Sequence, residues 1–345
     1  MLTIALSSCR VSSLTGLIGI GKKSMGFMRE RQLAANGLDF FVAEAGEPGN
    51  PLVLCLHGFP ECWASWRYQL PVLAQSGYHA VAPDLRGYGY TGGPAEVDAY
   101  RQSVLAEDVI ALIRALGHDS AILVGHDWGC ALTWQVARRY PQMIRAVVGM
   151  SVPYGGPAPE APTESMRRLF EDRFFYMLYF QQPQLPEQEL EADVPSSLRK
   201  IFHGLSAEGI ADFRVRPDDT GFLQSMPTPD EQPRWMREED LAYYVERFQH
   251  SGFTGQINWY RAMDASWEES RDDDNWQLPM PALFIGGMQD PVIVFSQKAL
   301  QRMPDYIPDL RTVMLDQCGH WIQMEQAAEV NRELIAFLEE VDGKA

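Results

Sequence analysis

The stretch AILVGHDWG, residues 121–129, decides the fold, because it joins a short apolar run to a helical pattern. Gly125 and Gly129 let the backbone turn sharply and bring the helix close to the strand. Asp127, at the tip of this elbow, is then expected in the open above the carboxyl edge of a sheet. The alternative is that Asp127 only caps the helix, a position that Asp favours, but a cap needs no glycine on both sides.

An aspartate at the tip of the elbow determines the class of reaction. Most elbows of this kind carry a serine. A carboxylate instead attacks a saturated carbon that bears a leaving group, and it forms an alkyl-enzyme ester. Water must then hydrolyse that ester at its carbonyl. Epoxide opening and carbon–halogen displacement both follow this logic.

The sequence around the elbow alternates between strand and helix, the rhythm of a mostly parallel sheet with helices on both faces. This alternation of strand and helix stops at the Pro/Gly-rich stretch 152–162, and the strand pattern returns at residue 281. We therefore expect an α/β core, residues 30–152 and 277–345, interrupted by a helical insert, residues 153–276. Strands are expected at 38–45, 51–57, 78–84, 121–125, 143–150, 281–287 and 310–315, and core helices at 105–116, 128–140 and 324–341.

Charge and cysteine content exclude several classes of function. The 345 residues carry a formal net charge of −17, which disfavours nucleic acid, an anionic membrane surface or an anionic substrate as partner. The chain has no run of about 20 apolar residues, so no membrane span is expected. Its five cysteines lack metal or C-x-x-C spacing, which predicts reduced thiols, a cytoplasmic location and no metal or other cofactor. The oligomeric state stays open, with a homodimer as one option.

The N-terminal segment, residues 1–29, lies outside the predicted fold. It contains no Asp or Glu and is rich in Ser, a composition with a weak likeness to an organelle transit peptide. A disordered extension or a start codon placed too far upstream are equal alternatives.

Two further loops follow predicted strands and carry polar groups. In HGFP, residues 57–60, the backbone N–H of Phe59 is a candidate oxyanion donor together with that of Trp128, although HGFP alone is also an ordinary strand-to-turn junction. Later in the chain, Asp290 and His320 each follow a strand. The order nucleophile, acid, histidine predicts His320 as general base and Asp290 as the group that orients it.

The helical insert contributes two candidate phenols, Tyr179 in LYFQ and Tyr260 in NWYR. A phenol aimed at an epoxide oxygen would polarise the ring and protonate the developing alkoxide. The insert is rich in aromatic residues, so ordinary packing is the alternative for either tyrosine taken alone.

Taken together, these motifs resemble the epoxide hydrolases of the α/β-hydrolase superfamily, close to the soluble epoxide hydrolase type. The resemblance covers about residues 31–341 and implies an α/β-hydrolase core with an inserted helical cap. It implies Asp127 as nucleophile, Asp290 and His320 as its charge relay, and Tyr179 with Tyr260 as paired donors to the epoxide oxygen; Tyr176, one turn earlier, is the rival of Tyr179. A cis Phe59–Pro60 bond is also implied. It rests on HGFPECWASWR at 57–67, DLRGYGYT at 84–91, VGHDWG at 124–129, LYFQ at 178–181, NWYR at 258–261, GGMQDP at 286–291 and GHW at 319–321.

The resemblance predicts hydrolysis of a small apolar epoxide by water to a vicinal diol, through a covalent ester on Asp127. The main alternative is a haloalkane dehalogenase, which shares GHDWG but often has Asn at the position of Phe59 and needs no tyrosine pair, because a halide takes no proton. A binding protein that kept the pocket and lost the chemistry is a second alternative. Which epoxide is the substrate does not follow from the sequence.

Overall fold

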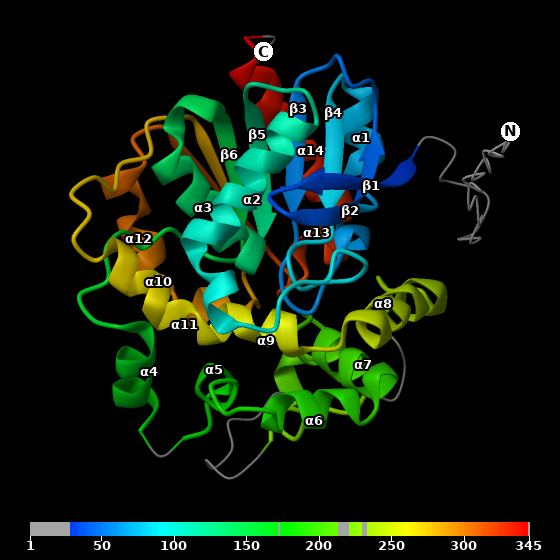
Figure 1. Ribbon diagram of the computed structural model, residues 1–345, viewed down its shortest axis with the longest axis vertical. Helices are drawn as coiled ribbons and strands as arrows, with labels where there is room; N and C mark the ends of the chain where they lie inside the picture. The colour runs from blue at the N-terminus through cyan, green and yellow to red at the C-terminus, as the bar shows by residue number, and fades with distance from the viewer. Residues whose placement is uncertain (1–27, 172, 213–220, 230–232, 344–345) are drawn as a thin grey trace, which may run out of the picture.

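The computed structural model describes residues 28–171, 173–212, 221–229 and 233–343. Within these residues the strands form one sheet in the order β1-β2-β4-β3-β5-β6-β7-β8 (Figure 1). β1 and β2 pair antiparallel, as do β2 and β4, and the remaining pairs are parallel. The strands are β1 Arg29–Ala35, β2 Leu38–Ala45, β3 Leu52–Leu56, β4 His79–Pro83, β5 Ala121–His126, β6 Ile144–Met150, β7 Ala282–Gly287 and β8 Leu310–Leu315.

Helices cover both faces of the sheet, which is why its central strands are apolar along their whole length. Every residue of β3, β5 and β7 is buried. In Figure 1, α2 and α3 lie in front of the sheet and α14 lies behind it. The core helices are α1 Leu70–Gln75, α2 Gln102–Ala115, α3 Trp128–Arg139, α11 Pro291–Phe295, α12 Gln297–Tyr306, α13 Ile322–Glu325 and α14 Ala327–Val341.

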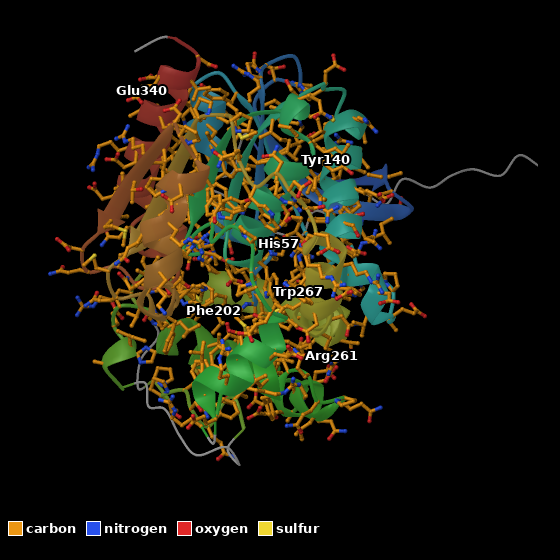
Figure 2. All side chains as sticks on the ribbon, turned by 90° about the vertical axis from the view of Figure 1, so that its left-hand side faces the viewer. His57, Tyr140, Phe202, Arg261, Trp267 and Glu340 are labelled. Carbon is orange, nitrogen blue, oxygen red and sulfur yellow. The ribbon has the colours of Figure 1, made fainter. Side chains whose placement is uncertain are left out.

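The chain between β6 and β7 forms a layer of helices across one end of the sheet, here called the cap and defined as residues 153–276. It lies in the lower part of Figure 1, and in Figure 2 the cap residues Phe202 and Arg261 lie at the opposite end of the molecule from Glu340. Its helices are α4 Pro162–Phe170, α5 Tyr176–Tyr179, α6 Leu185–Glu191, α7 Val194–Gly204, α8 Glu238–Ser251, α9 Thr254–Arg261 and α10 Met263–Ser270.

The seven predicted strands agree with the observed ones to within one or two residues. The structure differs from the prediction in one additional strand, β1, and in the last helix. β1 was not predicted, because its sequence RERQLAA is mostly exposed and lacks the apolar alternation of a half-buried strand. The single helix expected at 324–341 is two helices, because the backbone breaks at Gln326, where φ is −124° and ψ is 44°.

Arg29 belongs to β1, so the sheet begins one residue before the expected boundary. The remaining prediction for the N-terminal segment concerns residues 1–27, which lie outside the described residues. Among the helices that are described, none combines the length and the apolar character needed to cross a membrane.

Candidate active site

Asp127 occupies a strained turn between β5 and α3, as the elbow motif predicted. Its φ of 50° and ψ of −119° lie in a region that non-glycine residues seldom adopt. The flanking glycines permit a close approach: a Cβ on Gly129 would lie 2.1 Å from the carbonyl oxygen of Leu56, and one on Gly125 would lie 2.3 Å from that of Gly129. The turn therefore projects the Asp127 carboxylate away from the sheet.

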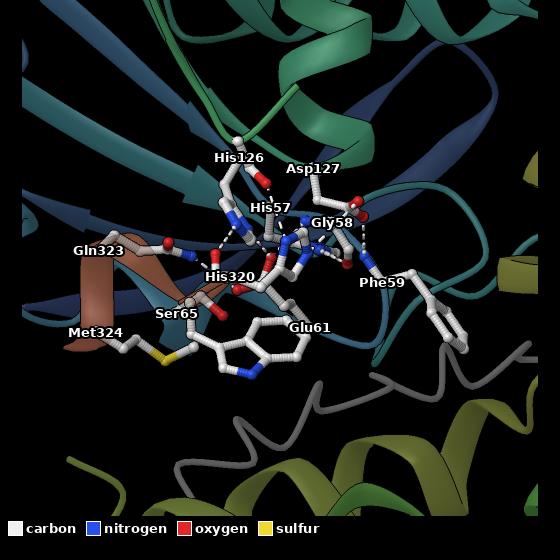
Figure 3. Close-up of polar contacts among 12 residues, drawn as sticks. His57, Gly58, Phe59, Glu61, Ser65, His126, Asp127, His320, Gln323 and Met324 are labelled. Carbon is white, nitrogen blue, oxygen red and sulfur yellow. Dashed lines mark hydrogen bonds and ion pairs between the residues drawn. The ribbon is translucent and has the colours of Figure 1, made fainter. Parts of the chain in front are cut away.

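The loop after β3 supplies a hydrogen-bond donor to this carboxylate. The backbone N–H of Phe59 donates to Oδ1 of Asp127 at 2.9 Å (Figure 3). Trp128 is the first residue of α3, and the N–H groups of a first helical turn have no partner within the helix. The Phe59–Pro60 bond is cis, as the resemblance implied.

His320 lies between two carboxylates. Its Nδ1 is 3.1 Å and 3.2 Å from the two oxygens of Asp290, and its Nε2 is 3.7 Å from Oδ2 of Asp127. Asp290 is fully buried, follows β7 and accepts a hydrogen bond from the backbone N–H of Val292 at 2.8 Å. The structure thus brings together the three residues that the sequence nominated from the ends of three different strands.

The electrostatic surroundings of His320 favour its charged form. Burial by itself lowers the pKa of the imidazole, since it penalises a cation. The charge of Asp290, the hydrogen bond to Asp290 and the charge of Asp127 outweigh burial and raise the pKa of His320 to about 9. In the resting protein, His320 is therefore protonated at neutral pH.

A buried network behind the site fixes the loops that carry these groups (Figure 3). Glu61 accepts hydrogen bonds from the backbone N–H of Gly58 and from Nε2 of Gln323, both at 2.7 Å. Its carboxylate also lies 2.7 Å from Nδ1 of His126, whose Nε2 is 2.7 Å from the carbonyl oxygen of His320. Glu61 thereby links the loop after β3 to the loop after β8.

The charge and hydrogen bond of His126 overcome the effect of burial and lower the pKa of Glu61 to about 2. The sequence alone suggests no role for either residue, although Glu61 lies in HGFPECWASWR and His126 lies in VGHDWG. A glutamate within an apolar strand-end motif was the available signal, because a buried carboxylate needs partners.

A cavity of about 620 Å³ lies between the core and the cap, with Asp127, His320 and Phe59 in its wall. Apolar side chains make up most of the remaining wall. They include Met166, Leu169, Phe170, Phe174, Phe222, Met226, Val292 and Phe295.

The structure corrects the placement of one tyrosine. Tyr260 lines the cavity as predicted, and its neighbour there is Tyr176, with ring centroids 5.8 Å apart. Tyr179 is not among the cavity-lining residues. It packs against Phe174, and burial and a hydrogen bond to Glu189 raise its pKa. Residues three apart on a helix share a face but are offset by about 4.5 Å along the axis, so a slip of one turn exchanges Tyr176 for Tyr179.

The two cavity phenols are suited to donate rather than to ionise. Burial and the charges of Asp127 and Asp290 hold the pKa of Tyr176 well above its usual range, against a hydrogen bond with Tyr260 that lowers it. Burial is also the main cause that raises the pKa of Tyr260. Both phenols therefore keep their protons, and both lie close enough to Asp127 for its charge to raise their pKa values.

This fold with its elbow and histidine loop defines an α/β hydrolase, and a family model described as alpha/beta hydrolase fold matches residues 51–327. The chain is 39% identical to epoxide hydrolase A of Mycobacterium tuberculosis, over 91% of this chain and 98% of that protein. It is 36% identical to bifunctional epoxide hydrolase 2 of Sus scrofa, over 85% of this chain and 52% of that protein, so it spans about half of the latter. The crystal structure of epoxide hydrolase A from Mycobacterium thermoresistibile is similar with a TM-score of 0.85 and 40% identity, over 90% of this chain and 98% of that one. The chain belongs to the epoxide hydrolases of the α/β-hydrolase fold family.

Proposed function

We propose that this enzyme converts apolar epoxides to vicinal diols through a hydroxyalkyl ester on Asp127. The observation that carries the proposal is the meeting of Asp127 and His320, from the core, with the phenols of Tyr176 and Tyr260, from the cap, around one cavity. A largely apolar wall favours an apolar substrate, because burial of apolar surface supplies most of the binding free energy in such pockets.

In the first half-reaction, Asp127 attacks one carbon of the epoxide. Oδ1 is held by the Phe59 N–H, which leaves Oδ2 for the attack. A new bond forms between Oδ2 and the carbon as the ring carbon–oxygen bond breaks. The ring oxygen takes a proton from Tyr176 or Tyr260, so that the product is a neutral hydroxyl on the ester and that tyrosine is left as a phenolate.

In the second half-reaction, water hydrolyses the ester. His320 in its neutral form takes a proton from water through Nε2, and the hydroxide attacks the ester carbonyl carbon. Negative charge develops on Oδ1, which accepts a hydrogen bond from the Phe59 N–H. The backbone N–H of Trp128 is the second donor that we propose for this charge; such a donor is worth roughly 3 kcal/mol. Asp290 stabilises the imidazolium until the alkoxide of the diol leaves and takes its proton. Asp127 is then a carboxylic acid, and its proton returns to the phenolate of Tyr176 or Tyr260, which restores the resting enzyme.

The test is to separate the half-reactions at His320. A carboxylate needs no general base for its attack, whereas water does, so His320→Gln should still form the ester and fail to hydrolyse it. Intact-protein mass spectrometry after exposure to styrene oxide should show a gain of one epoxide mass, located on the peptide that contains Asp127. The unaltered enzyme, which clears the ester, is the matched control.

Labelled water provides a second test in a single turnover of the unaltered enzyme. The oxygen that enters the diol should come from Asp127, and the solvent label should appear in the protein. Label in the first diol without a protein adduct would indicate direct attack by water and would contradict the proposal. Release of halide from haloalkanes without diol formation from epoxides would assign the site to a dehalogenase.

A further inference from the structure

Ser151 lies at the end of β6, between the strand that leads to Asp127 and the strand that leads to Asp290. It is fully buried and its φ is 74°. The backbone N–H of Ser151 donates to the carbonyl oxygen of Ile285 at 3.1 Å, which fixes the residue to β7. The sequence alone suggests no role for Ser151.

The hydroxyl of Ser151 touches both members of the His–Asp pair. It donates a hydrogen bond to Oδ2 of Asp290. Its Oγ also lies 2.9 Å from Nδ1 of His320, closer than either oxygen of Asp290, at 3.1 Å and 3.2 Å. Most side-chain hydrogen bonds in proteins go to backbone or water, so a buried serine held by two functional side chains is unusual.

The direction of these hydrogen bonds follows from counting protons. An ionised carboxylate can only accept, so the single proton of the Ser151 hydroxyl points to Asp290. Only lone pairs then remain on Oγ to face His320, which means that Nδ1 must carry a proton. The arrangement leaves Nε2 directed to the side of Asp127, where its distance to Oδ2 is 3.7 Å.

We propose that Ser151 is a positioning residue for the hydrolytic half-reaction, which holds His320 as the Nδ1–H tautomer and draws charge from Asp290. The inference rests on the function proposed above. Neutral His320 can accept a proton from water only through Nε2, and Ser151 favours that tautomer. The attack of Asp127 on the epoxide does not use His320, so it does not depend on Ser151.

Loss of the hydroxyl has a second consequence, on the pH dependence of hydrolysis. The hydroxyl shares the charge of Asp290, so its removal strengthens the pull of Asp290 on the imidazolium. This gain in charge outweighs the loss of a neutral acceptor at Nδ1. The other charged and titratable groups around His320 are Asp127 at the elbow, Glu61 in the loop after β3, His126 at the end of β5 and Glu325 in α13. None of them changes on substitution of Ser151, so the pH at half-maximal hydrolysis should move upward.

The experiment compares Ser151→Ala with Ser151→Gly in single turnovers of styrene oxide. Both variants lack the hydroxyl, but glycine adopts a positive φ without strain and alanine does not. If the hydroxyl matters, both variants should form the ester within about twofold of the normal rate and hydrolyse it roughly 10- to 100-fold more slowly, the loss expected for one hydrogen bond to a charged group. The ester should accumulate, and the pH midpoint of hydrolysis should rise.

Three outcomes would overturn the inference: unchanged hydrolysis in both variants, a loss confined to Ser151→Ala, which would indicate backbone strain, or an equal loss of ester formation. The nitrogen chemical shifts of His320 in the unaltered enzyme give a reading that needs no variant, and at a pH where the ring is neutral they should report a proton on Nδ1. His320→Gln separates the two proposals. If it accumulates ester and the Ser151 variants do not, only the role of Ser151 fails; if it forms no ester, the proposed function fails.

Discussion

The core and the cap each contribute one half of the site, and they hold their residues by different means. In the core, Asp127, Asp290 and His320 follow β5, β7 and β8 and are joined by directed polar contacts of 3.1 to 3.7 Å. In the cap, Tyr176 and Tyr260 project from the short helices α5 and α9. Ring contacts surround Tyr260, with centroid distances of 4.9 Å to Trp128, 5.0 Å to Phe180 and 5.6 Å to Phe59.

This difference shows that the side chains of the core are positioned more precisely than those of the cap. Parallel register aligns the ends of β5, β6, β7 and β8 at one edge of the sheet, so the core residues are fixed by the same hydrogen bonds that form the fold. Aromatic packing in the cap is less directional, but a phenol that only donates a proton tolerates more freedom than a nucleophile. We therefore expect core substitutions to abolish a half-reaction and cap substitutions to slow one.

The largest effect is expected for Asp127→Ala, which removes the proposed nucleophile. Turnover of epoxide should fall by about 10⁴-fold or more, the loss seen when a residue of such a catalytic group is removed. The far-ultraviolet circular dichroism spectrum should stay unchanged, since the side chain lies in the cavity wall and packs no core. Asp39→Ala, at an exposed position on β2, is the matched control and should keep full activity. Normal turnover by Asp127→Ala would exclude the ester mechanism.

A smaller effect is expected from the cap phenols, and it sharpens the choice between Tyr176 and Tyr179. Tyr176→Phe and Tyr260→Phe should each slow ester formation about tenfold, and the double variant by roughly 10³-fold, within the usual range for general acid catalysis. Each phenol can partly replace the other, which is why the single effects are small. Tyr179→Phe is the matched control and should change ester formation by less than about twofold. Rapid-quench measurement of the adduct provides these rates.

A result in which Tyr179→Phe is slower than Tyr176→Phe would restore the assignment made from the sequence. If the tyrosine variants slowed only hydrolysis of the ester, the phenols would not be the donors to the epoxide oxygen.

The residues that the core contributes to the site could be predicted from the sequence better than those that the cap contributes. Asp127, Asp290 and His320 could be nominated because each lies in the loop or turn that follows a predicted strand, and strand ends converge wherever the sheet is parallel. The sequence favoured Tyr179 over Tyr176, although Tyr176 is the one that lines the cavity, because α5 has only four residues and offers no periodicity to set its orientation. Ser151 could not be nominated, because its two partners, Asp290 and His320, lie far from it in the sequence and no local pattern connects the three residues.

The smallest effect is expected for the pKa of His320, which the negative charge of Asp127 raises. The pKa of His320, about 9, is raised chiefly by the charge and hydrogen bond of Asp290 and then by the charge of Asp127. Asp127→Ala removes one negative charge and should lower the pKa, and Asp290→Ala should lower it further because the hydrogen bond is lost as well. Nuclear magnetic resonance titration of the His320 ring measures both shifts, with the unaltered enzyme as reference.

The sign of this shift bears on the order of the two half-reactions. In the proposed mechanism, alkylation converts the Asp127 carboxylate into a neutral ester, which removes the same charge as Asp127→Ala and lowers the pKa of His320. The neutral fraction of the imidazole at a given pH near 8 therefore increases when the ester forms, and that is the moment at which a base is needed. Hydrolysis of the ester should accordingly reach half its maximal rate at a lower pH than the midpoint of the His320 titration in the resting enzyme. If the pKa of His320 in Asp127→Ala equals or exceeds its value in the unaltered enzyme, this coupling is contradicted. The charge of Asp127 would then have no influence on the protonation of His320.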